Sequence, residues 1–142
     1  MKPERVFADT NLFLRYLTND VPAQADAVEE LLRRAAAHEL VLVTHSLVIA
    51  EIVWTLESCY RLPKNRVQEN VLALLNTPGL EVVDADLVLQ AIISYADQNV
   101  DFIDAYSGAW LLAHDIQCAY TFDRQHFSRL PGVVVLTPGT AS

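Results

Sequence analysis

The segment from Arg5 to Leu17 restricts the fold more than any other part of the chain. Its short apolar run, Val6 to Ala8, stops at Asp9, and a helix-like pattern follows at once. Apolar side chains at positions 12, 13, 16 and 17 are spaced to line one face of a helix. The segment therefore predicts a buried strand, a turn and a helix, with Asp9 at the carboxyl end of the strand. In open parallel α/β sheets the ligand crevice lies outside those ends.

The same alternation of apolar runs and helical spacing continues along the chain. Further strands are expected at about 40–43, 80–83, 118–121 and 133–136, and helices at about 21–38, 46–60, 65–75, 84–98, 102–114 and 124–130. Strands that alternate with helices predict a mostly parallel sheet of about five strands covered on both faces, a three-layer α/β/α arrangement. Because no linker, repeat or low-complexity stretch interrupts the pattern, we expect residues 1–142 to form a single domain.

Composition and charge exclude several classes of protein. The chain is 52% hydrophobic and 20% charged, which is typical of a globular protein rather than a disordered one. Its net charge of −8 argues against broad non-specific nucleic-acid binding, which relies on basic surface. A nuclease remains compatible with that charge, because divalent ions offset the acids of a metal site. Cys59 and Cys118 form no CxxC pair, so neither a disulfide framework nor a zinc site is expected.

Hydropathy gives no sign of a membrane segment. No apolar run approaches the ~18 residues that a membrane span needs. The N-terminal apolar stretch is interrupted by Asp9 and is too short for a signal-peptide core. We therefore expect a cytoplasmic protein.

Asp9 on its own is best explained as a helix cap, because its side-chain oxygens can accept free amide protons of the first turn. Similar caps are expected for the next two helices, from Asn19 or Asp20 and from Thr44 or Ser46. A catalytic role for Asp9 requires further acids in comparable places.

Glu51 is the first of these acids. Three apolar residues flank it on each side within a helix that should be mostly buried. A charge buried there would cost several kcal/mol unless it were paired or bound to a metal. The alternative is that Glu51 lies on the one solvent-exposed face of the helix, together with Thr55 and Ser58. The two explanations are evenly balanced.

Asp101 and Asp104 stand three residues apart at the start of a predicted helix, where both side chains can point the same way. An N-cap explains Asp101 slightly better than a ligand does, and an acid in the first helical turn is favourable at Asp104. Asp123 repeats the arrangement at Asp9, since it ends a strand and precedes a helical segment. Thr121 could add a hydroxyl at the same edge of the sheet.

The acids are more informative as a set. Asp9 and Asp123 both end strands, the helix with Asp104 leads into the Asp123 strand, and Glu51 is no cap. Convergent carboxylates repel one another and need cations. Oxygen ligands without Cys or His spacing select magnesium or manganese. The chemistry that such a site supports best is phosphodiester hydrolysis.

The histidines show no metal spacing. His45 and His126 are expected near strand ends in packing or surface roles, and Trp54 and Trp110 are expected in the core.

The ordered set of motifs resembles PIN-domain ribonucleases, specifically the VapC-type toxins of toxin–antitoxin pairs. The matching pieces are Ala8-Asp9-Thr10-Asn11, Ala50-Glu51, Asp101-Phe102-Ile103-Asp104-Ala105, and Thr121-Phe122-Asp123-Arg124 followed by Phe127. The resemblance implies that Asp9, Glu51, Asp104 and Asp123 are the catalytic, metal-binding acids. It makes Asp101 a further candidate acid, and Thr10, Asn11 and Thr121 polar support.

The same resemblance implies Mg²⁺- or Mn²⁺-dependent cleavage of RNA, a homodimer, and inhibition by a small antitoxin protein. Two other readings stay open at this stage. A receiver-like phosphoacceptor domain also uses a strand-end Asp with magnesium, but it needs a lysine near a late strand, and none follows Lys64. A catalytically silent PIN-like binding module is disfavoured because all four acids are present.

Overall fold

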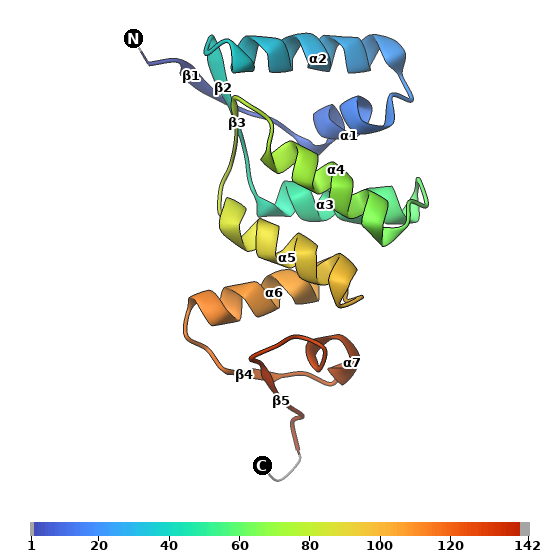
Figure 1. The fold of residues 1–142 in the computed structure, drawn as a ribbon, viewed down its shortest axis with the longest axis vertical. Coiled ribbons are helices and arrows are strands. Elements are labelled where there is room, and N and C mark those ends of the chain that lie inside the picture. Colours follow the sequence, from blue (N-terminus) through green and yellow to red (C-terminus); the bar gives the residue numbers. More distant parts are fainter. Residues whose placement is uncertain (1, 140–142) are drawn as a thin grey trace. The chain divides into compact units, whose positions relative to one another are not determined.

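The computed structural model describes residues 2–139, which fall into two compact units. Unit 1 is Met1–Ala85 and unit 2 is Asp86–Ser142. Each unit contains parallel strands joined through helices, so the α/β class is confirmed (Figure 1). The single domain expected for residues 1–142 stays a prediction, and residues 1 and 140–142 lie outside the described part.

Unit 1 is built on a three-stranded parallel sheet in the order β1-β2-β3. Its elements are β1 (Glu4–Phe7), α1 (Thr10–Thr18), α2 (Pro22–Ala36), β2 (Leu40–Thr44), α3 (Ser46–Ser58), α4 (Lys64–Leu75) and β3 (Leu80–Val82). The central strand β2 buries alternate side chains, as a strand packed on one face does. The register pairs Phe7 with Val43 and Thr44 with Val82, so the carboxyl ends of neighbouring strands lie at one edge.

Gly79 brings the start of β3 close to α2. Its backbone has φ +80°, and a Cβ at this position would lie 2.5 Å from the carbonyl carbon of Ala35. Glycine alone meets both requirements without strain. Its carbonyl accepts the Leu42 N–H over 2.9 Å, which fixes β3 beside β2.

Unit 2 contains α5 (Ala85–Asp97) except for its first residue, followed by α6 (Phe102–Ala113), β4 (Cys118–Tyr120), α7 (Arg124–Phe127) and β5 (Val134–Leu136). Strands β4 and β5 pair in parallel, with Cys118 opposite Val134. Tyr95 of α5 meets Phe102 of α6 edge-on at 6.3 Å between ring centroids. Gly108 allows Leu130 to reach α6, since a Cβ there would be 2.7 Å from the Leu130 Cδ1. The absence of a side chain at Gly108 therefore makes room for Leu130 against α6.

All five predicted strands are present, divided into sheets of three and two hydrogen-bonded strands within the described residues. The predicted caps of α2 and α3 are wrong. Val21 and His45 hold the N-cap positions, and neither side chain caps its helix within residues 2–139. Asp20 instead accepts hydrogen bonds from Tyr60 Oη at 2.6 Å and Thr18 Oγ1 at 3.0 Å.

The two tryptophans are also misplaced by the sequence pattern. Trp54 is 64% exposed and Trp110 is 42% exposed, so neither belongs to the core. Apolar spacing identifies a helix face but not which neighbour covers it. Both cysteines are free thiols on the surface. Over the described residues, no helix is both long and apolar enough to cross a membrane.

Candidate functional site

Asp9 stands where β1 gives way to α1. The strand ladder continues to Ala8, whose N–H donates to the Val43 carbonyl over 2.9 Å. Asp9 then adopts an extended backbone, and its Oδ1 accepts the Thr10 N–H over 2.8 Å. Thr10 is buried, whereas Asp9 is exposed. The capping role expected of Asp9 is therefore confirmed, and it places a carboxylate at the carboxyl edge of the sheet. Asn11 follows on the exposed side of α1.

Two further groups of unit 1 lie at the same edge. His45 follows β2 as Asp9 follows β1, two residues beyond the Phe7–Val43 pair. Its ring stacks on Phe7 with centroids 5.6 Å apart, which confirms its expected place near a strand end. Thr44 is buried, and its Oγ1 finds no hydrogen-bond partner in the described part of the chain. A buried hydroxyl of this kind departs from the usual pairing of buried polar groups.

Glu51 lies on the exposed side of α3. The opposite side buries Val48, Ile49, Ile52, Val53 and Leu56. Leu47 and Trp54, one turn before and after Glu51, are exposed with it. The exposed alternative for Glu51 is therefore confirmed, and no buried charge has to be explained. Helix α3 packs against α1, the helix that Asp9 caps.

In unit 2, Asp101 and Asp104 form the start of α6. Asp101 occupies the N-cap position with an exposed side chain, but that side chain caps nothing among the described residues. Asp104 lies in the first turn, and its side chain is only 24% exposed. Asp101 is therefore an N-cap by position, without the hydrogen bond that would explain the residue structurally.

Asp104 is the most perturbed acid of the candidate set. Partial burial raises the pKa of Asp104 above its usual 3.8, and the negative charge of Asp101 raises it further. A hydrogen bond and charge from His126 oppose this shift, and Asp123 adds a smaller repulsion. Three carboxylates of unit 2 thus lie within electrostatic range of one another. Perturbed acids of this kind cluster at functional sites.

Asp123 is fixed by its own turn. It caps the short helix α7, where its Oδ1 accepts the Gln125 N–H over 3.2 Å. The Thr121 hydroxyl accepts the Asp123 N–H over 3.0 Å and donates to the Asp123 carbonyl over 3.1 Å. Thr121 therefore holds the turn that presents the Asp123 carboxylate beyond β4.

His126 is a neighbour of these acids to which the sequence assigned only a packing or surface role near a strand end; the structure places it in α7. Its Nδ1 lies 3.2 Å from Asp104 Oδ2 and 3.3 Å from the Asp101 backbone nitrogen. The two partners are more than 20 residues away in the chain, so helical or strand spacing could not reveal them. The only signal was a histidine shortly after a strand-ending acid.

The candidate acids divide between the units, with Asp9 and Glu51 in unit 1 and Asp101, Asp104 and Asp123 in unit 2. Within residues 2–139, no group of three or more His, Cys, Asp or Glu side chains is arranged to hold a metal. The donor chemistry itself is clear, since carboxylate and hydroxyl oxygens are ligands that Mg²⁺ and Mn²⁺ accept.

Comparison with known protein families gives a match over most of the chain. The family model described as PIN domain matches residues 6–133, a range that includes every candidate acid. The search of curated proteins finds no match to this chain. Since the family model spans nearly all of both units, the chain belongs to the PIN domain family.

Proposed function

We propose that this chain is a Mg²⁺- or Mn²⁺-dependent endoribonuclease whose metal ligands are Asp9, Glu51, Asp104 and Asp123. Membership of the PIN domain family supports a nuclease-like protein. The observation that carries the metal site is the crowding of acids around Asp104, whose pKa is raised by burial and by the charges of Asp101 and Asp123. Such repulsion costs free energy in the metal-free protein, and a divalent cation would offset it.

The acids have distinct parts in this proposal. A bound divalent cation would lower the pKa of the attacking water and stabilise the leaving oxygen of a phosphodiester. Asp9 and Asp123 offer carboxylates fixed by their own helix caps, at 2.8 Å and 3.2 Å from the amides that they cap. Thr10, Asn11 and Thr121 support those positions, and Asp101 ranks behind Asp104 because it is the more exposed of the two.

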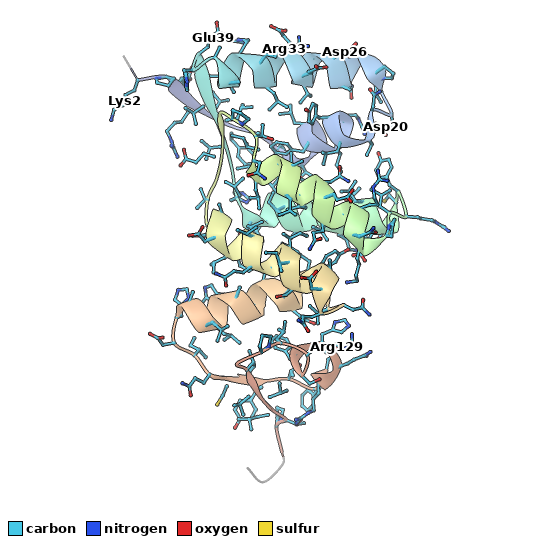
Figure 2. All side chains as sticks on the ribbon, in the orientation of Figure 1. Lys2, Asp20, Asp26, Arg33, Glu39 and Arg129 are labelled. Carbon is cyan, nitrogen blue, oxygen red and sulfur yellow. The ribbon has the colours of Figure 1, made fainter. Side chains whose placement is uncertain are left out.

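The first test is RNA cleavage by the purified wild-type protein. Cleavage in millimolar Mg²⁺ or Mn²⁺, abolished by chelator and restored by added metal, is expected. If the folded protein cleaves no RNA in either metal, the result would reject the nuclease and favour a catalytically silent PIN-like binding module. Asp26→Asn is the matched control, because Asp26 is an exposed acid on the side of α2 that faces away from α1 (Figure 2).

We further propose that the protein acts as the toxin of a toxin–antitoxin pair. An unregulated ribonuclease would harm its host, so an inhibitory partner follows from the activity. A guanidinium can bind carboxylates in a fork, so an antitoxin Arg placed among the four acids could displace a metal. Expression alone should arrest growth, and co-expression of a small neighbouring gene should restore it. Harmless expression of a folded, metal-active protein would reject the toxin role and leave the nuclease standing.

A groove in unit 1 supports the docking of such a partner. It runs between α1 and α2, is lined by Leu12, Ala27, Val28 and Leu31, and continues into a hollow that Asp9 borders. An amphipathic helix can bury its apolar face in a groove of this kind. We also propose a homodimer, because apolar side chains such as Leu89, Ile93 and Leu112 are exposed on unit 2. Sedimentation equilibrium at micromolar concentration tests the dimer directly.

A further inference from the structure

Helix α7 approaches the start of α6 through His126. The Nδ1 atom of His126 lies 3.2 Å from Asp104 Oδ2 and 3.3 Å from the Asp101 backbone nitrogen. The side chains of His126 and Asp104 are 30% and 24% exposed, so the contact between them is partly shielded from water. His126 therefore lies on the one acid of the set whose environment is most perturbed.

One ring nitrogen cannot serve both neighbours at once. To donate to the Asp104 carboxylate, Nδ1 must carry a hydrogen; to accept the Asp101 N–H, it must be bare. Because Asp101 is exposed, its backbone N–H can donate a hydrogen bond to water instead. The partly buried Asp104 carboxylate has fewer alternative hydrogen-bond donors. A charge-assisted bond to a carboxylate is also the stronger of the two. The Nδ1–H tautomer, donating to Asp104, is therefore favoured.

We propose that His126 is a positioning residue, whose Nδ1–H holds Asp104 Oδ2, so that Asp104 Oδ1 would be the oxygen that binds a divalent cation. This inference rests on the proposed function, in which Asp104 is a metal ligand. Groups that hydrogen-bond a ligating carboxylate fix its orientation, and their loss usually costs 10–100-fold in metal affinity or activity. The sequence suggested only packing or a surface position for this histidine.

The placement of α7 does not depend on His126 alone, so substitutions there can be interpreted. Arg129 donates to the Asn99 carbonyl just before α6, and buried Leu130 packs against Gly108. Asp123 caps the helix independently. Removing the imidazole should therefore leave the fold of unit 2 intact, which unchanged circular dichroism and thermal unfolding of the metal-free variants will verify.

The test compares Mn²⁺ affinity in four variants by isothermal titration. His126→Asn keeps an N–H donor at the position of Nδ1, whereas His126→Gln moves the donor outward and His126→Ala removes it. We expect Ala and Gln to bind Mn²⁺ about tenfold more weakly and Asn to bind nearly as the wild type does. The control Gln125→Ala, at an exposed neighbouring position of α7, should not change affinity. The proposal would be overturned if His126→Ala bound Mn²⁺ as tightly as the wild type does. It would also be overturned if His126→Asn lost as much Mn²⁺ affinity as His126→Ala.

A second readout needs no metal. The ¹⁵N shift of His126 Nδ1 in the metal-free protein at pH 8 distinguishes a protonated nitrogen from a bare one. A protonated Nδ1 that becomes bare in Asp104→Asn supports the positioning contact. A bare Nδ1 in the wild type overturns the contact even when Mn²⁺ binds. Absence of Mn²⁺ binding by the wild type would reject the proposed metal site, and the tautomer would still decide the contact itself.

Discussion

The two units use the same local device in different surroundings. Asp9 in unit 1 and Asp123 in unit 2 both end a strand and cap the following helix. Behind Asp9 lies a three-stranded sheet whose central strand buries three of its five residues, whereas β4 and β5 bury none of theirs fully. The perturbed acid, Asp104, lies in unit 2. Unit 1 thus offers a carboxylate on a well-packed frame, and unit 2 offers carboxylates that repel one another.

Despite this difference, loss of charge should affect RNA cleavage alike in the two units. Asp9→Asn, Asp104→Asn and Asp123→Asn should each lower metal-dependent RNA cleavage by at least about 100-fold, because a neutral amide is a poor ligand for a hard cation. Asp101→Asn should be milder. The control Asp97→Asn, an exposed acid at the end of α5, should cleave normally. A loss in Asp101→Asn as large as in Asp104→Asn would reverse the ranking of those two acids.

Metal should stabilise the whole protein by mass action. Mn²⁺ at 100 times its dissociation constant adds about 2.7 kcal/mol to the free energy of unfolding if it binds only the native state. Thermal unfolding with millimolar Mn²⁺, Mg²⁺ or chelator measures this. The rise in melting temperature should disappear in Asp104→Asn, and an unmoved wild-type melting temperature would count against a shared carboxylate site.

The Asp9 cap can be separated from the Asp9 charge. Asn caps a helix about as well as Asp, whereas Ala costs about 1 kcal/mol at an N-cap. Asp9→Asn should therefore keep the metal-free stability of the wild type and lose activity, while Asp9→Ala should lose both. Urea unfolding of the metal-free proteins compares them. Equal stability in Asn and Ala would mean that the Thr10 amide does not need this cap.

At Asp104, removing the charge should stabilise the metal-free protein, because this charge is unfavourable in the folded state. Its folded pKa is raised above 3.8, so the folded protein holds that proton more tightly than the unfolded chain does. The stabilising contribution is present below pH 3.8 and is lost as pH rises through the folded pKa. Metal-free Asp104→Asn should therefore gain stability relative to the wild type as pH rises from 3 to 7. A constant difference across that range would contradict the shift.

The smallest effect is expected at the surface of unit 1. The Tyr60 hydroxyl, followed by Thr18 and Arg15, lowers the pKa of Asp20 below 3.8 (Figure 2 labels Asp20). A lowered folded pKa gives stability that is present above pH 3.8 and is lost as pH falls through the folded value. Tyr60→Phe should thus destabilise slightly at pH 7 and not at pH 2. A double-mutant cycle with Asp20→Asn isolates the pair.

Local patterns predicted the helices and strands because these elements depend on the spacing of apolar and polar residues that are close together in the chain. The caps at Asp9 and Asp123 were predictable for the same reason, since each side chain accepts an amide one or two residues away. Asp20 was assigned wrongly because Tyr60, 40 residues later, binds it instead. The exposure of Trp54 and the contact of His126 with Asp104 likewise depend on distant parts of the chain. The spacing of residues predicts secondary structure, whereas these features depend on which elements pack against one another in the folded protein.

The central claim is that the candidate acids bind a divalent cation. Its most direct test is Mn²⁺ affinity in the wild type, in Asp9→Asn, in Asp104→Asn and in the double variant. Because a neutral amide is a poor ligand for a hard cation, each of these variants should bind Mn²⁺ more weakly than the wild type does. Wild-type affinity in Asp9→Asn would contradict the claim for Asp9, and wild-type affinity in Asp104→Asn would contradict it for Asp104.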